Sequence, residues 1–181
     1  MKKLLTTGFA LSLLAATSVG CSRNADDDIQ ENTQYQSQAE ITLEQAKQTA
    51  EAAQGESAIG VELDEEDGNL VYEVGFADTD VFVDAIAGNI LTTEPSDDSV
   101  ENAQYQSLAK VTLEQAKQTA EAAQGETAIS VKLDEEDNSL VYEVGFVDAD
   151  VFVDAGTGDV LATELETDSE DPIIQGSIQV P

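Results

Sequence analysis

The chain repeats itself at an offset of seventy residues. Residues 31–76 and 101–146 align without a gap, and both contain the runs LEQAKQTAEAAQGE and LVYEVGF. The match continues through FVDA at 82–85 and 152–155. Two copies are too few for a solenoid, which needs about three or more units. We therefore expect two small units, each of which folds largely by itself.

Each copy opens with the pattern of an amphipathic helix. Thr42 with Gln45 three residues later is a capping-box signature, and Ile41 before the cap can contact Ala46. Gly55 is the residue type that ends helices in the left-handed conformation. The expected buried stripe consists of Leu43, Ala46, Ala50 and Ala53. The second copy repeats the capping roles with Thr112, Gln115 and Gly125.

Short strands are expected after the helix. A first strand over residues 59–63 leads through a polar turn at 64–69 into LVYEVGF, in which every second residue is large and apolar. This period of two is typical of a strand with one face on a core. Shorter apolar runs follow at 81–83 and 90–91. The predicted fold class is α+β, with two tandem repeats, each one helix packed on a three- to four-stranded antiparallel sheet.

LVYEVGF is expected to be the central strand of each copy. Its large side chains supply the bulk that the alanine-rich helix lacks. A unit of about 55 residues is near the lower limit for a self-sufficient core. We therefore expect either modest stability or packing of the two units against each other.

The first twenty residues have the features of an export signal. Lys2 and Lys3 precede an apolar stretch at residues 4–16, which is too short to span a bilayer because a spanning helix takes about 20 residues. The sequence Ser-Val-Gly-Cys at 18–21 resembles the lipobox of bacterial lipoproteins, although Ser18 stands where a leucine is usual. The resemblance implies that Cys21 receives a diacylglycerol and becomes the N-terminus. The alternative is an ordinary secretory signal with an incidental cysteine.

These patterns divide the chain into six segments. Residues 1–20 are the expected lipoprotein signal peptide, 21–38 a flexible acidic tether, 39–95 the first repeat and 96–108 a linker. Residues 109–165 are the second repeat and 166–181 an acidic tail. The end of that tail, from Ile173 to Val180, is expected to pair with a sheet edge or to stay loose. Tyr35 and Tyr105, which precede the two repeats, are expected to add a short strand or to pack across the junction.

The composition is strongly acidic. Lys and Arg number 7, Asp and Glu number 38, and His is absent. Without Lys2 and Lys3 of the signal, 5 basic and 38 acidic side chains remain, a formal charge of −33. Such a surface repels nucleic acid and anionic headgroups, so nucleic acid is excluded as a partner. The acidity indicates solubility, with a cation store as the alternative.

The motifs of each copy resemble those of the PepSY domain. The most specific part is Tyr-Glu-Val followed by Val-Asp-Ala-x-x-Gly, at 72–88 and 142–158, and the resemblance covers residues 39–94 and 109–164. It implies a secreted or membrane-attached bacterial protein of a family thought to restrain peptidases locally, with no catalytic residues. Asp84, Gly88, Asp154 and Gly158 match the motif, and we interpret them as turn-forming residues.

Little in the sequence indicates catalysis. Histidine is absent, the single thiol is assigned to lipidation, and no phosphate loop or nucleophile elbow is present. The prediction is therefore a non-enzymatic protein without a cofactor. Calcium prefers oxygen ligands, and the candidates are carboxylates of the two DEED runs. These candidates are Asp64, Glu66, Asp67, Asp134, Glu136 and Asp137, for which a solvated hairpin turn is the alternative.

Two functions of different classes follow. The first is a lipid-anchored extracytoplasmic module, in the periplasm or on the cell surface, that binds and regulates a peptidase or another envelope protein. The second is an acidic calcium-binding or structural protein of the cell envelope.

Overall fold

The computed structural model describes residues 25–167 and 172–180 of the 181-residue chain. Within these residues, four helices and eight strands follow each other in two equal sets. The first set is α1 (Ala25–Gln38), α2 (Leu43–Gln54), β1 (Gly60–Glu66), β2 (Asn69–Gly75), β3 (Thr79–Asp84) and β4 (Ile90–Pro95). The second set is α3 (Ser99–Leu108), α4 (Leu113–Gln124), β5 (Ser130–Glu136), β6 (Ser139–Gly145), β7 (Ala149–Asp154) and β8 (Val160–Leu165).

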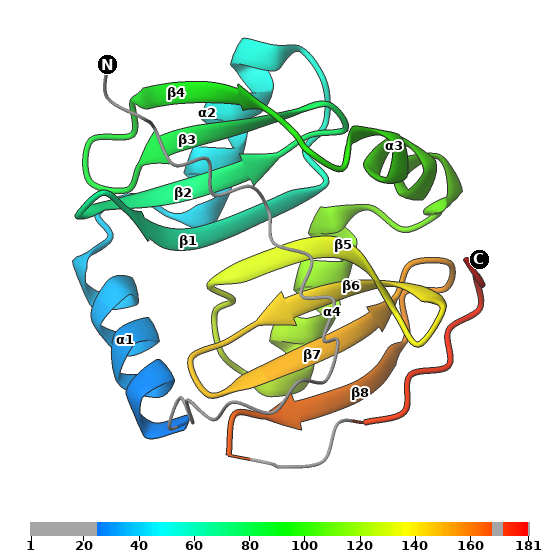
Figure 1. Ribbon diagram of the computed structural model, residues 1–181. Helices are drawn as coiled ribbons and strands as arrows, with labels where there is room; N and C mark the ends of the chain where they lie inside the picture. Colours follow the sequence, from blue (N-terminus) through cyan, green and yellow to red (C-terminus); the bar gives the residue numbers. More distant parts are fainter. Residues whose placement is uncertain (1–24, 168–171, 181) are drawn as a thin grey trace, which may run out of the picture.

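The strands form one continuous antiparallel sheet in the order β4-β3-β2-β1-β5-β6-β7-β8. The two repeats meet where β1 pairs with β5, through Gly60↔Lys132, Val61↔Val131 and Glu62↔Ser130. Position 61 therefore lies opposite its own counterpart, 131, which gives the sheet a local twofold symmetry (Figure 1). The predicted α+β class with two helix-and-sheet repeats is confirmed, and each repeat contributes four strands.

The main helix of each repeat begins and ends where the sequence indicates. The Thr42 side chain accepts a hydrogen bond from the Gln45 amide at 3.2 Å, and the Gln45 side chain accepts one from the Thr42 amide at 2.8 Å. Gly55 ends the helix with φ at 79°. The predicted stripe is correct at Leu43, Ala46 and Ala50, but Ala53 is exposed and this part of the prediction is wrong. Ala53 lies in the last turn, beyond the part of the helix that packs on the sheet.

One hydrophobic core joins the two repeats. α2 and α4 cover the same face of the sheet (Figure 1), and a single cluster of buried residues includes Phe76 and Val61 of the first repeat with Phe146 and Val131 of the second. The expected packing of the two units against each other is confirmed, and the folding of each unit by itself stays a prediction. The physical reason is size, because each small unit gains buried apolar area at the junction.

The segments before the two repeats are helical. The flexible tether expected at 21–38 is wrong from residue 25 onward, where α1 begins, and the linker expected at 96–108 contains α3. Neither segment has an apolar stripe in its sequence, but Gln and Glu are good helix formers. The short-strand alternative for Tyr35 and Tyr105 is wrong, since both lie in these helices. Tyr105 is buried in the shared core, which confirms the packing alternative for that residue.

The hairpin turns are shorter than the sequence indicates. β1 and β5 run through the DEED sequences to Glu66 and Glu136, so only two residues connect each strand to the next. In the first hairpin these are Asp67 and Gly68, with φ at 52° and 81°. Positive φ at both positions is typical of the tight type I′ hairpin, whose twist matches that of the strands.

Candidate interaction surfaces

The predicted site residues fall in two parts of the molecule. Cys21, the predicted lipidation site, lies outside the residues that the structure describes. The calcium candidates lie near the tips of the β1–β2 and β5–β6 hairpins. Among the described residues, no group of three or more acidic side chains is arranged to hold a metal ion.

The carboxylates of the second DEED run make contacts within the protein. Asp134 forms an ion pair with Lys132, with 3.5 Å between Oδ2 and Nζ. Asp137 accepts a hydrogen bond at 2.8 Å from the backbone amide of Ile174. Asp64 and Asp134 also accept hydrogen bonds from the amides that follow them. The structure thus gives these side chains local structural contacts and does not bring the six candidates together.

The sheet face opposite α2 and α4 carries a dense group of charges. On this face Lys132 forms a second ion pair with Glu143, at 3.3 Å between Nζ and Oε2. The first repeat has glutamate at the equivalent position, Glu62, directly opposite Glu73 on β2. One repeat therefore places unlike charges across the strands and the other places like charges, which destabilise a sheet. The sequence does not indicate the central position of Lys132, because the pairing of β1 with β5 cannot be read from either strand.

Burial and mutual repulsion keep protons on several of these carboxyls. Burial, followed by the charges of Asp80 and Glu62, raises the pKa of Glu73 to about 8. Burial and the charge of Glu143 raise the pKa of Asp150 to about 7. Burial and nearby acids also raise the pKa of Asp80 to about 6. This face therefore changes its charge near neutral pH, where isolated carboxyls do not.

We expect the protein to become more stable as the pH falls from 8 to 5. A carboxyl whose pKa is higher in the folded state binds its proton on folding, so its contribution is fully present below the unfolded value and is lost as the pH rises through the folded value. For Glu73 this window runs from the ordinary glutamate pKa of 4.5 to about 8. Solvent screens the partly exposed groups, so the expected gain in the free energy of unfolding is about 2 kcal/mol. Urea unfolding at several pH values measures it.

Glu73→Gln is the control for this dependence. Glutamine does not titrate, so the variant should show a flatter pH profile and a higher unfolding midpoint at pH 8. A wild-type midpoint that falls as the pH is lowered from 8 to 5 would contradict the assignment of raised pKa values to this face.

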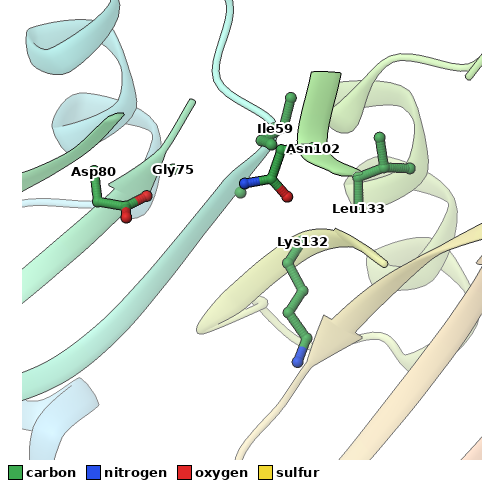
Figure 2. A pocket seen from close by; sticks show the side chains of 7 residues that line it. Ile59, Gly75, Asp80, Asn102, Lys132 and Leu133 are labelled. Carbon is green, nitrogen blue, oxygen red and sulfur yellow. The ribbon is translucent and has the colours of Figure 1, made fainter. Parts of the chain in front are cut away.

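A small hollow lies at the junction of the repeats. Its volume is ≈ 20 Å³, which is room for about one water molecule. Asp80 of β3, Asn102 of α3 and Lys132 of β5 line it together with Ile59 and Leu133 (Figure 2). The hollow is too small for an organic substrate. Asn102 donates a hydrogen bond to Ser96 at 3.1 Å, so this side chain fixes the start of α3.

Two larger clefts flank the junction on the helix side. One has a volume of about 430 Å³ and is lined by Lys47, Leu133 and Tyr142 among others. The other, of about 380 Å³, has the symmetry-related lining that includes Lys117, Leu63 and Tyr72. The lysines form ion pairs with acids of their own helices. These clefts contain no arrangement of groups that indicates catalysis.

The outer strands of the sheet expose backbone and apolar side chains. Within the described residues, β4 pairs only with β3 and β8 only with β7. On β4, Leu91 is 52% exposed and Ile90 is exposed as well. On β8, Val160 and Leu165 are exposed. Edge strands with exposed apolar side chains are sites where another chain can add a strand.

The aspartates of the two Val-Asp-Ala-x-x-Gly motifs form turns, as the sequence predicts. Asp84 Oδ1 accepts hydrogen bonds from the amides of Ile86 and Ala87 at 2.8 and 2.9 Å. Asp154 Oδ1 does the same for Gly156 and Thr157 at 2.7 and 2.9 Å. Gly88 and Gly158 have positive φ, at 71° and 80°.

Asp154 also contacts the C-terminal segment, residues 172–180, which pairs with β6 through an antiparallel bridge between Ser139 and Gln179. Pairing with a sheet edge was one of the two expectations for this segment. The segment does pair with the sheet, but at the end of the inner strand β6 and not along an edge strand. The positions that receive the segment were not identified from the sequence. Ser139 follows a tight turn and gives no sequence signal of its own.

The fold places the chain in a class of α+β proteins built from tandem units of one helix packed on an antiparallel sheet. A family model described as "Peptidase propeptide and YPEB domain", PepSY, matches residues 40–94 and 110–164. These two matches cover more than half of the chain, so the protein belongs to the PepSY family. The resemblance inferred from the sequence is thereby confirmed for both repeats.

Solved structures with detectable similarity have low sequence identity. A protein described as a candidate lipoprotein from Clostridium difficile 630 is 19% identical, with a TM-score of 0.38, over 70% of this chain and 97% of that one. The C-terminal domain of YpeB from Bacillus megaterium is also 19% identical, with a TM-score of 0.32, over 71% of this chain and 66% of that one. No curated protein matches the chain. No helix in the described part of the chain is long and apolar enough to cross a membrane.

Proposed function

We propose that this protein is a non-enzymatic, lipid-anchored extracytoplasmic module that binds and regulates a peptidase or another protein of the cell envelope. Membership of a family described by peptidase propeptides and YPEB supports the class of partner. The signal-like sequence at 1–20 and Cys21 support export and anchoring. Two acyl chains on one cysteine hold a protein stably at a membrane, whereas one holds it only marginally.

The observation that carries the proposal is the exposed edge strand β4. Its apolar side chains Ile90 and Leu91 are exposed. Among the described residues, β4 pairs with one strand only, β3. An extended segment of a partner can add to such an edge through backbone hydrogen bonds, with side-chain contacts that give specificity. The net charge of −31 favours a partner with a basic surface, because opposite charges accelerate encounter.

Leu91→Lys is expected to lower partner recovery in a pull-down about tenfold or more, because a lysine on an edge strand opposes strand addition. The anchored protein is purified from its own membrane, and the proteins that accompany it are identified and tested for peptidase inhibition. The variant should keep the wild-type unfolding midpoint, since Leu91 is exposed. Gln48→Lys, an exposed change on α2, is the charge-matched control and should not affect recovery.

The same preparation tests the anchor. Cys21→Ser protein should leave the membrane fraction, and its continued presence there would argue against lipidation at this residue. Equal recovery of partners with wild-type protein and Leu91→Lys would contradict binding at the β4 edge.

A further inference from the structure

The C-terminal segment lies along β6 as a bound peptide does. The N–H of Leu140 donates to the carbonyl of Ile178 at 3.0 Å, and the N–H of Val180 donates to the carbonyl of Asn138 at 2.9 Å. The pairing of β6 with β7 ends at Val141 and Asp154. The N–H of Leu140 and the carbonyl of Asn138 lie on β6 and the turn before it, beyond this last pair. The segment therefore occupies the free end of an inner strand, which is strand addition in the sense used for peptide-binding domains.

Two buried polar side chains receive the middle of the segment. Asp154, 2% exposed, accepts hydrogen bonds from both the amide and the hydroxyl of Ser177. Ser139, fully buried, accepts from the amide of Gly176 at 3.0 Å and from the side-chain amide of Gln179 at 3.0 Å. With the segment in place both side chains are buried and hydrogen-bonded to it, so they form the polar centre of its binding site.

Apolar side chains of the segment enter both faces of the sheet. Ile174 packs against Val141 and Phe152 on the face opposite the helices. Val180 joins the main core on the helix side, and Ile178 packs against that core. The segment thus has three aliphatic anchors around a polar centre.

The site selects for small residues at two positions. A Cβ added to Gly176 would lie 3.1 Å from Cβ of Ser139 and 3.4 Å from Oδ2 of Asp154. A residue larger than glycine therefore does not fit easily at this position of the segment. On the protein side, a Cβ added to Gly156 would lie 2.3 Å from Oγ of Ser177 and 3.0 Å from Cγ1 of Ile178. Gly156 is therefore the position at which a side chain would exclude the segment.

The first repeat shows that a side chain is tolerated at this position of the turn. Its equivalent of Gly156 is Ile86, which is 44% exposed and donates the same turn hydrogen bond to Asp84. The contacts of Gly156 indicate that Ile86 would collide with a segment bound in the same way. The neighbouring positions agree, because Leu91 of the first repeat is exposed whereas its equivalent, Leu161, packs in the cluster with Ile174.

We propose that the end of β6 in the second repeat is a peptide-binding site for an extended partner segment with a Gly-Ser-aliphatic centre, and that residues 174–180 of this chain occupy it in cis. The first repeat does not share this specificity. The site is separate from the β4 edge, so this proposal does not depend on the proposed binding of a partner at that edge.

Ser177→Asp in the full chain frees the site for a test. The new carboxylate meets Asp154 and repels the segment, and hydrogen exchange at the amide of Leu140 should then become faster. A synthetic peptide with the sequence of residues 172–180 should bind this variant and restore protection. It should bind wild-type protein roughly tenfold more weakly or worse, because the attached segment competes at high effective concentration.

The matched control is the double variant Gly156→Ile with Ser177→Asp. Isoleucine copies the first repeat, so the fold should persist while the peptide loses roughly tenfold or more in affinity. Absence of binding to the folded Ser177→Asp protein would overturn the proposal, as would equal binding to the double variant. A wild-type dimer that Gly156→Ile abolishes would identify a second copy as the occupant and would overturn the assignment to a partner.

Discussion

Replacing Lys132 by glutamate is expected to lower the free energy of unfolding by about 3 kcal/mol. Lys132 is the cation between Asp134 and Glu143, at 3.5 and 3.3 Å. Burial opposes its charge, but these acids together with Glu62 outweigh burial and raise the pKa of the lysine. Its loss leaves partly buried carboxylates without a counter-charge, and the new glutamate adds to their repulsion. Urea unfolding at pH 7.5 measures the change.

Glu62→Lys is the reciprocal substitution at the equivalent position of the first repeat. It removes an acid that favours the charge of Lys132, but it also places a cation directly opposite Glu73. We expect the new attraction to Glu73 to outweigh that loss and to raise the free energy of unfolding by about 1 kcal/mol. The two variants should therefore shift the urea midpoint in opposite directions. A shift in the same direction for both would show that charge pairing across β1, β2, β5 and β6 does not control stability.

Phe146→Ala is expected to lower the free energy of unfolding by about 3–5 kcal/mol, the usual range for removing a buried aromatic side chain. Phe146 is almost completely buried in the core that both repeats share. Because the sheet is continuous through β1 and β5, we expect a single cooperative transition that moves as a whole. Circular dichroism reports the sheet and helices, and tyrosine fluorescence reports the four tyrosines, of which Tyr72 and Tyr142 lie in the two repeats.

Phe76→Ala is the matched variant in the first repeat. Phe76 is also fully buried, and its substitution should move the same transition by a similar amount. Two separate transitions, with each variant moving only one of them, would show that the repeats unfold independently in spite of the shared core.

The elements of each repeat were predictable because their signals are local. Thr42 with Gln45 and Gly55 mark both ends of α2, and the alternation in LVYEVGF marks an inner strand. α1 and α3 were missed because their helical propensity is not accompanied by an apolar stripe. The hairpin turns are predicted too long because polar residues such as Asp64 are typical of turns, whereas in the structure they lie on the solvated face of a strand.

Features that depend on pairing between distant segments were not predictable. Val61 looks like any inward-facing strand residue, and nothing in its neighbourhood specifies Val131 as its partner. Asp154 reads as a turn residue, which it is, but its second carboxylate oxygen receives Ser177 from a segment more than twenty residues away. Lys132 is one of few cations in the chain, yet its role depends on which strands meet. Long-range geometry of this kind is not contained in a residue's own sequence pattern.

The pairing of Val61 with Val131 also bears on how such a chain arose. A strand that meets the same strand of a duplicate, at the same position, has the geometry of an isologous contact between identical subunits. A protein containing one such repeat would present this edge to a second molecule and close as a homodimer. Gene duplication and fusion would then have converted a concentration-dependent association into a permanent intramolecular one, after which the two halves were free to diverge.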